Sequence, residues 1–307
     1  MARAAAAPET GVAPTASGAR ACWLVLHELH DTSAPALIEA LAAARPGQAV
    51  HGLSSAALLT WVRWQSRLDA TGASCRLQWP GVSGLDLHAG PSPRQGPGAT
   101  ALPGLTLAGV VNRLHPLTLP TTADDAEYKS AEWQALCNAW LHGLPCPVLN
   151  RPRCADVMAA TRTAVRWRQR AAQAGLPIWP LTPVATGHGV AHTLQHRGMG
   201  SDGAPQSAGL LVVGEQTLPA LDRSGPHWPL DLQQAAARAV RDAGLDLLAW
   251  TGGTDARGVW RVSGATPWPV LRAFGSAALD AISGWLDPTP DPAPLAKSRR
   301  AAGKAAA

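Results

Sequence analysis

The sequence predicts an α/β protein in which a parallel α/β domain is followed by a smaller α+β portion. In the first third of the chain, short apolar runs alternate with a segment of helical spacing, which is the order of a parallel sheet with crossover helices. In the last third, paired strands are separated by single helices, which is typical of α+β architecture. With 307 residues, 46% of them apolar, the chain can bury a sizeable core divided between subdomains.

The N-terminal elements follow from apolar spacing and from the positions of Gly and Pro. The predicted elements are a strand at 21–29, a helix at 34–44, a strand at 49–55, a helix at 57–72, and strands at 74–80 and 105–112. The first helix ends before Pro46-Gly47 and the second at Gly72, because these residues interrupt helices. Residues 90–99, "GPSPRQGPGA", are expected to form a flexible surface loop.

Two predicted strand ends have nearly the same text, "VVNR" at 110–113 and "VLNR" at 148–151. In open α/β sheets, ligands bind at the carboxyl ends of the strands. Asn tolerates the backbone angles of a strand exit, and Arg presents five donors that suit carboxylate or phosphate. We therefore expect Asn112, Arg113, Asn150 and Arg151 at one crevice, where they would bind a small acidic ligand. The alternative is that each Asn-Arg closes a turn and that the Arg pairs with a nearby acid.

The middle of the chain predicts two helices and a histidine pattern. The helices are expected between Thr121 and Leu144 and from Asp156 to Gly175. His188, His192 and His196 follow at i, i+4 spacing, so that on one helical face their imidazoles could bind zinc. A straight helix usually brings only two such residues to one metal, and no acidic residue precedes them. Their role is left unassigned.

The C-terminal elements are clearer. They are a hairpin at 209–221, a helix at 231–244, an antiparallel strand pair at 245–250 and 259–264, and a final helix at 270–286. The tight Gly214 turn predicts the hairpin, and the "TGGTDARG" turn joins the strand pair.

Charge and cysteine content exclude several classes of function. The net charge of +5 owes much to the last eleven residues, "KSRRAAGKAAA", and no stripe of Lys and Arg interleaved with aromatics occurs elsewhere, so we do not expect a nucleic-acid partner. The first apolar run is too short to cross a membrane. Five cysteines without C-x-x-C spacing fit reduced thiols in a cytoplasmic protein. Residues 1–20 are expected to be a disordered leader and residues 287–307 a disordered basic tail.

Taken in order, these segments resemble the ATP-grasp superfamily, in particular small bacterial proteins related to carboxylate–amine ligases. The matching texts are "GVVNRL", "AEYKSAEWQALCNAWLHGLPCPVLNRP", "WRQRAAQAGLPIWPLTP", "LLVVGEQ", "AARAVRDAGLDLLAW" and "WRVSGATPWP", and the resemblance as a whole covers residues 20–286. The resemblance implies a pre-ATP-grasp-like α/β domain at 21–120 and a shortened ATP-grasp-like α+β portion at 121–286.

The resemblance also implies ATP and magnesium as cofactors of a ligase that phosphorylates a substrate carboxylate. Lysines and magnesium normally stabilise the transferring phosphoryl group, and acidic residues with an Asn hold the metal. This chain departs from that pattern, because no lysine occurs between Lys129 and Lys297 and no Asp or Glu from Ala256 through Leu279. Arg197 and Arg223 are the candidates to replace the lysines.

We therefore expect a divergent ATP-grasp-fold protein that lost the standard Mg-ATP site. It would act as a binding or helper component in a biosynthetic pathway, with a complete enzyme of that pathway as its partner. The alternative is an active ATP-dependent carboxylate–amine ligase in cofactor or peptide-tailoring biosynthesis, which would use Arg in place of Lys or groups from a partner subunit. An unrelated α/β binding protein is the third hypothesis.

Overall fold

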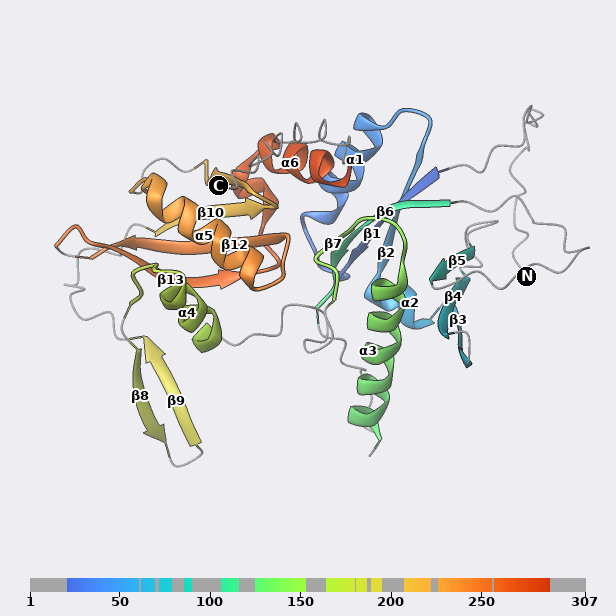
Figure 1. Ribbon diagram of the computed structural model, residues 1–307, viewed down its shortest axis with the longest axis horizontal. Helices are drawn as coiled ribbons and strands as arrows, with labels where there is room; N and C mark the ends of the chain where they lie inside the picture. Colours follow the sequence, from blue (N-terminus) through green and yellow to red (C-terminus); the bar gives the residue numbers. More distant parts are fainter. Residues whose placement is uncertain are drawn as a thin grey trace, which may run out of the picture.

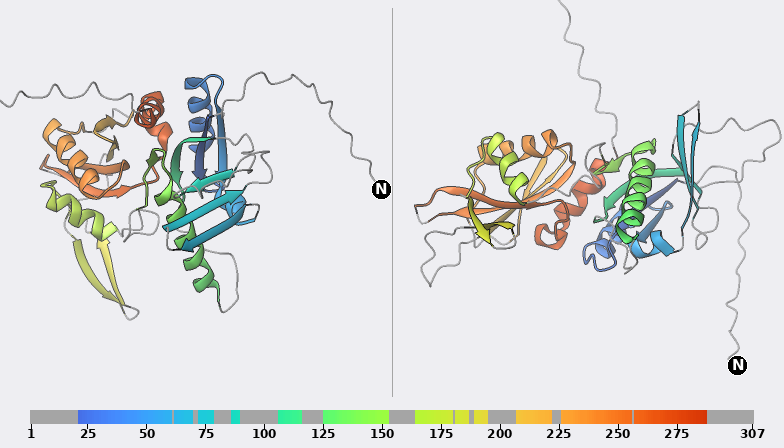
Figure 2. Two further views of the ribbon diagram at one scale, coloured as in Figure 1. Left: turned by 45° about the vertical axis from the view of Figure 1, so that its right-hand side comes forward. Right: turned by 90° about the horizontal axis from the view of Figure 1, so that it is seen from below.

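The computed structural model describes residues 21–60, 62–69, 72–78, 86–89, 106–115, 125–152, 164–179, 181–186, 189–194, 207–221, 226–255 and 257–287. An N-terminal sheet and a C-terminal sheet lie on opposite sides of the molecule, with two helices meeting between them (Figures 1 and 2). Among the described residues, no helix combines the length and the apolar character that a membrane crossing requires.

The N-terminal sheet is parallel throughout and has the strand order β2-β1-β6-β7. Its strands are β1 (Ala21–His27), β2 (Ala49–Ser54), β6 (Thr106–Arg113) and β7 (Val148–Leu149). Alternate residues of β1 are buried on both faces: Leu24 packs toward α3 (Ala126–Gly143), and Val25 packs into the core that α1 (Ala34–Ala44) covers. A parallel sheet covered on both faces requires such continuously apolar strands. The predicted strands at 21–29, 49–55 and 105–112 and the helix at 34–44 are confirmed.

The predicted helix at 57–72 is wrong beyond its first turn. The chain forms the short helix α2 (Ser55–Thr60) and then the strand β3 (Arg63–Asp69), which pairs antiparallel with β4 (Gly72–Gln78). Here Val62 and Trp64 pack on the core while Arg63 and Gln65 are exposed, an alternation with the period of a strand. β5 (Asp86–Ala89) completes this antiparallel sheet of order β3-β4-β5, so the predicted strand at 74–80 does not join the parallel sheet.

The C-terminal sheet is antiparallel and has the order β11-β10-β12-β13. Its strands are β10 (Ser207–Val213), β11 (Gln216–Pro219), β12 (Leu247–Thr254) and β13 (Trp260–Thr266). Helices α4 (Ala164–Gln173) and α5 (Leu230–Asp242) cover one face, as Figure 1 shows. The 3₁₀ helix η1 (Leu271–Phe274) and α6 (Ser276–Leu286) cover the other. The hairpin and strand pair are confirmed, whereas the predicted helix at 270–286 is divided at Gly275, whose φ of 70° ends a helix.

Of the three histidines whose role was left unassigned, the structure describes His192, which lies on a strand and not on a helix. Residues around His192 form a hairpin of β8 (Leu181–Thr186) and β9 (Gly189–Leu194), which projects from the rest of the molecule in Figure 1. His188, His196, Arg197 and Arg223 lie outside the described residues.

One hydrophobic core joins the two sheets. Val25 and Val111 contribute to it from the N-terminal sheet, Leu211 and Leu247 from the C-terminal sheet, and Ile282 from α6. All five side chains are fully buried. The division expected at residue 120 falls outside the described residues and stays a prediction; α3 and β7, which follow it, pack with the N-terminal sheet.

Candidate functional site

The two Asn-Arg strand exits lie side by side. β6 and β7 pair in parallel, with Val110 opposite Val148 and Val111 opposite Leu149. The Asn112 side chain donates through Nδ2 to the carbonyl oxygen of Asn150 (3.2 Å). The shared text thus brings the two Asn residues into contact, as expected of neighbouring parallel strands.

Asn150 is a junction between the two sheets. Its φ of 57° lies in the left-handed region, which Asn adopts more easily than most residues. Its Oδ1 accepts hydrogen bonds from the backbone N–H groups of Asp246 (3.0 Å) and Leu247 (2.9 Å), and its Nδ2 donates to the Leu247 carbonyl (3.0 Å). These bonds use both polar atoms of the side chain, which is buried.

The Arg151 guanidinium closes the end of α3. Nη1 donates to the carbonyl oxygens of Leu141 (2.9 Å), His142 (2.8 Å) and Leu144 (2.8 Å), and Nη2 donates to that of Cys146. A helix leaves its last carbonyls without backbone partners, and a cation there also complements the helix dipole. Arg151 therefore caps the C-terminal end of α3. Arg113, by contrast, contacts Asp31 after β1.

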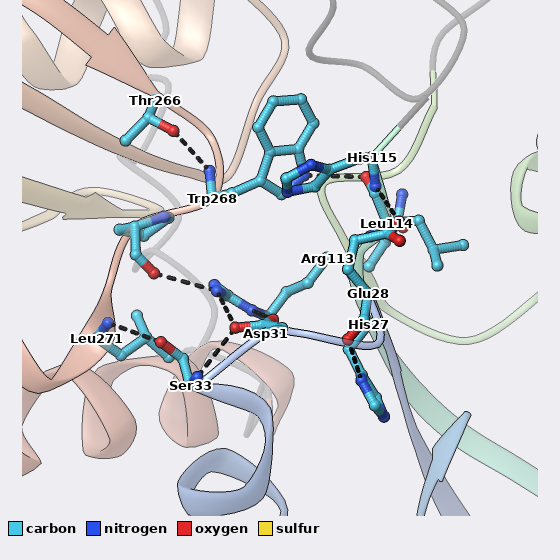
Figure 3. A network of polar contacts seen from close by, with 12 residues as sticks. His27, Glu28, Asp31, Ser33, Arg113, Leu114, His115, Thr266, Trp268 and Leu271 are labelled. Carbon is cyan, nitrogen blue, oxygen red and sulfur yellow. Dashed lines mark hydrogen bonds and ion pairs between the residues drawn. The ribbon is translucent and has the colours of Figure 1, made fainter. Parts of the chain in front are cut away.

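Arg113 forms a buried ion pair with Asp31, which follows β1 (Figure 3). Nε and Nη2 donate to the two carboxylate oxygens at 2.6 and 3.0 Å, and Nη2 also donates to the Pro269 carbonyl at 3.1 Å. The remaining nitrogen, Nη1, is enclosed and has no hydrogen-bond partner in the described part of the chain. This contact corresponds to the alternative reading of the Asn-Arg text, in which the Arg pairs with a nearby acid.

The ion pair sets the protonation state of Asp31. Burial alone would raise the pKa of this carboxyl, but the hydrogen bonds and charge of Arg113, with the backbone N–H of Ser33, outweigh it and hold the pKa below its usual value. Asp31 and Arg113 thus neutralise each other at neutral pH.

A cleft of about 490 Å³ opens beside this pair, at the carboxyl ends of β1 and β6. This is where ligands bind in open α/β sheets. One border is formed by the segment after β13, which is fixed by hydrogen bonds from Trp268 Nε1 to the Leu114 carbonyl (2.9 Å) and from the Leu271 N–H to Ser33 Oγ (3.0 Å). The lining residues are Glu28, Leu29, His30, Asp31, Thr32, Ser33, Arg113, His115, Thr266, Trp268, Pro269 and Val270.

Sequence reasoning missed most of this cleft. Glu28 Oε1 accepts the His115 backbone N–H (2.8 Å), and the His115 ring lies on the Trp268 indole with centroids 4.1 Å apart. Figure 3 shows these residues around the opening. A usable signal was present: the polar text "HELHD" directly follows the β1 run, so it occupies a strand exit next to that of β6.

The residues near the end of β13 do not fit a magnesium ion. The acids around this strand are engaged within the fold: Asp31, beside the segment after β13, pairs with Arg113 (2.6 Å), Asp246 accepts the Asn150 N–H (3.1 Å), and Asp255, before the start of β13, forms an ion pair with Arg261 (2.9 Å). The Ser263 carbonyl on β13 accepts two hydrogen bonds, at 2.9 and 2.7 Å, from the buried guanidinium of Arg168, which comes from α4. A cation at this position opposes a second cation. Among the described residues, no three His, Cys, Asp or Glu side chains are grouped to hold a metal.

By sequence, no family model and no curated protein matches the chain. By structure, the macrocyclase MdnB from Microcystis aeruginosa is similar at 15% identity and a TM-score of 0.58, over 86% of this chain and 98% of that one. MdnC of the same organism, bound with the precursor peptide MdnA, gives 13% and 0.59 over 86% and 99%. The ATP-grasp ligase PsnB, complexed with a minimal precursor, gives 13% and 0.57 over 87% and 100%.

Two sheets around a shared core, with a cleft at the parallel strand ends, define an α/β protein. The similarity over nearly the full length of these structures makes the fold specific: the chain has the ATP-grasp fold. The fold class expected from the sequence is confirmed.

Proposed function

We propose that this chain is an ATP-grasp-fold binding component of a peptide-modifying pathway and does not catalyse ligation by itself. Its partner would be a complete enzyme of the same pathway. The ligand site would be the cleft between the ends of β1 and β6 and the segment after β13.

The observation that carries this proposal is the set of charged residues at and around β13. Phosphoryl transfer needs cations and metal-binding carboxylates placed in advance. From Ala256 through Leu279 the chain has no Asp or Glu, and no Lys lies between Lys129 and Lys297. The buried Arg168 is directed to the Ser263 carbonyl. Loss of one such electrostatic contact costs a transition state several kcal/mol, so loss of both kinds would prevent ordinary ligase turnover.

The comparisons support a peptide as the ligand class. MdnC was solved with the precursor peptide MdnA bound, and PsnB with a minimal precursor. This chain is 13% identical to each of them. The cleft here has the size range of a pocket for a small ligand or a few residues of a peptide.

Calorimetric titration of the isolated chain with Mg-ATP tests the loss of the nucleotide site. We expect neither saturable heat nor a rise in Tm at about 5 mM nucleotide, because a bound ligand would stabilise the native state. Saturable binding would contradict the proposal. Steady release of ADP would support the alternative, an active ligase that uses Arg in place of Lys or a partner's groups.

The helper role is tested separately by the genomic setting and by reconstitution. We expect a complete ATP-grasp enzyme to be encoded beside this chain, and its peptide modification to accelerate when the purified chain is added. An unchanged rate over a range of chain concentrations would contradict the helper role, whatever the outcome with Mg-ATP.

A further inference from the structure

The cleft contains a carboxylate that lacks a cationic partner. Glu28 Oε1 accepts the His115 N–H at 2.8 Å, and Oε2 accepts the Ser55 hydroxyl at 2.6 Å. Both donors are neutral, and a carboxylate has about four lone-pair positions, so about two remain. In the described part of the chain, no Lys or Arg forms an ion pair with Glu28.

The other charges of the cleft are already balanced. Asp31 and Arg113 form a pair with side chains 10% and 2% exposed, and the unpartnered Nη1 of Arg113 is enclosed. An acidic ligand could not reach that nitrogen without displacing the surrounding atoms. Arg113 is the one Lys or Arg among the residues that line the cleft. Glu28 therefore gives the cleft a negative character.

Apolar side chains border the same opening. Leu29 is 64% exposed and Val270 is 47% exposed, and they come from the two segments that face each other across the cleft. Trp268 adds an indole wall that its stack with His115 holds in place. An apolar border around one carboxylate is complementary to a long apolar stem that ends in a cation, which is how Lys and Arg side chains bury themselves.

We infer that this cleft binds a basic side chain of a peptide, a lysine or an arginine, with Glu28 as its counter-ion. The aliphatic stem lies between Leu29 and Val270, and the ammonium or guanidinium group takes the free positions of the Glu28 carboxylate. This inference rests on the proposed function, because it names the ligand of the cleft assigned there. It replaces the small acidic ligand that the Asn-Arg exits predicted.

Calorimetry with four blocked pentapeptides tests the inference. Each has the form acetyl-Gly-Gly-X-Gly-Gly-amide, with X as Lys, Arg, norleucine or Glu. A fifth peptide, pentaglycine amide with a free N-terminus, carries an α-ammonium group in place of a basic side chain. We expect the Lys and Arg peptides to bind at least about tenfold more tightly than the norleucine peptide, and the Glu peptide to bind most weakly. Equal binding of Lys and norleucine, stronger binding of Glu, or the absence of any binding overturns the inference. If pentaglycine amide binds more tightly than the Lys and Arg peptides, the assignment to a basic side chain is overturned.

Two matched variants assign the effect to Glu28. Glu28→Gln keeps the shape and an acceptor oxygen, so we expect the Lys peptide to fall to the affinity of the norleucine peptide. Glu215→Gln removes the same charge from a residue outside the cleft, 84% exposed, and should leave binding unchanged. The comparison of Lys with norleucine in the unmodified chain decides the matter even if Glu28→Gln fails to fold. Heat with Mg-ATP would contradict the proposed function, whereas failure of the peptide series alone contradicts only this ligand.

Discussion

Asn150, at the end of β7, and Leu247, at the start of β12, exchange two hydrogen bonds across the boundary between the sheets. The Leu247 N–H donates to Asn150 Oδ1 at 2.9 Å, and Asn150 Nδ2 donates to the Leu247 carbonyl at 3.0 Å. A side chain that the sequence suggested for a ligand thus links the two halves of the fold.

Substitution of Asn150 should therefore act on stability. We expect Asn150→Ala to lower the free energy of unfolding by about 3 kcal/mol, because two backbone N–H groups lose their acceptor and Ala pays for the left-handed conformation. Asn150→Gly tolerates that conformation but also lacks the side chain, so its loss should be smaller by about 1 kcal/mol. Urea unfolding measures both. Equal losses would show that the φ of 57° contributes nothing.

The Arg113–Asp31 pair predicts acid sensitivity. The folded pKa of Asp31 lies below its unfolded value, so the stabilisation is fully present above the unfolded pKa and is lost as the pH falls through the folded pKa. We expect Asp31→Asn to be destabilised by about 3 kcal/mol at pH 7, where it leaves the buried Arg113 unpaired. Below about pH 4, the usual Asp value, the difference from the unmodified chain should shrink. Urea unfolding at a series of pH values checks this; a difference independent of pH would contradict it.

The sequence predicted the elements whose signal is local. The β1 run is apolar from Ala21 to Leu26 because both faces of the sheet are covered, and residues 34–44 keep helical spacing up to Pro46. The failure of the predicted helix at 57–72 has a physical cause. The helical spacing that includes Trp61 and Leu68 overlaps an alternation with a period of two at residues 62–65. Pairing with β4 stabilises the strand in place of the helix. Long-range pairing is not visible in local spacing.

The candidate cleft was only partly visible in the sequence, because of the four residues expected at the strand exits only Arg113 lines it. The pairing of β6 with β7 places the two repeated texts side by side, and a ligand site at strand ends is a general rule. That Arg113 would be neutralised by Asp31, 82 residues earlier, depends on which strand exits become neighbours. The role of Glu28 depends in the same way on the His115 N–H and the Ser55 hydroxyl.

Arg45 joins the end of α1 to the end of α6, and its removal should loosen this contact. Its guanidinium donates to Ser283 Oγ (2.8 Å), the Ser283 carbonyl (2.9 Å) and Asp287 Oδ2 (2.7 Å), and it lies 4.1 Å from the Trp23 ring centroid. Arg45→Met keeps the stem over Trp23 but loses the bonds, so we expect a loss of about 2 kcal/mol. Asp287→Asn is the control, since Asp287 is 56% exposed and its pair should contribute under about 1 kcal/mol. A larger loss for Asp287→Asn than for Arg45→Met would contradict this assignment.

The thiol of Cys22 should resist alkylation in the native chain. Burial, with a smaller contribution from the nearby Cys146, raises the pKa of Cys22 to about 11, and burial also raises the pKa of Cys146 against the opposing charge of Arg151. The thiolate is the reactive form, and at a pKa of about 11 only about one Cys22 thiol in a thousand is ionised at pH 8. We expect iodoacetamide at pH 8 to leave peptides that contain Cys22 or Cys146 unmodified in the native protein, and to modify them fully in urea. Mass spectrometry of the digests distinguishes these sites from the other cysteines, and rapid native labelling of Cys22 would show that the strand β1 is open to solvent.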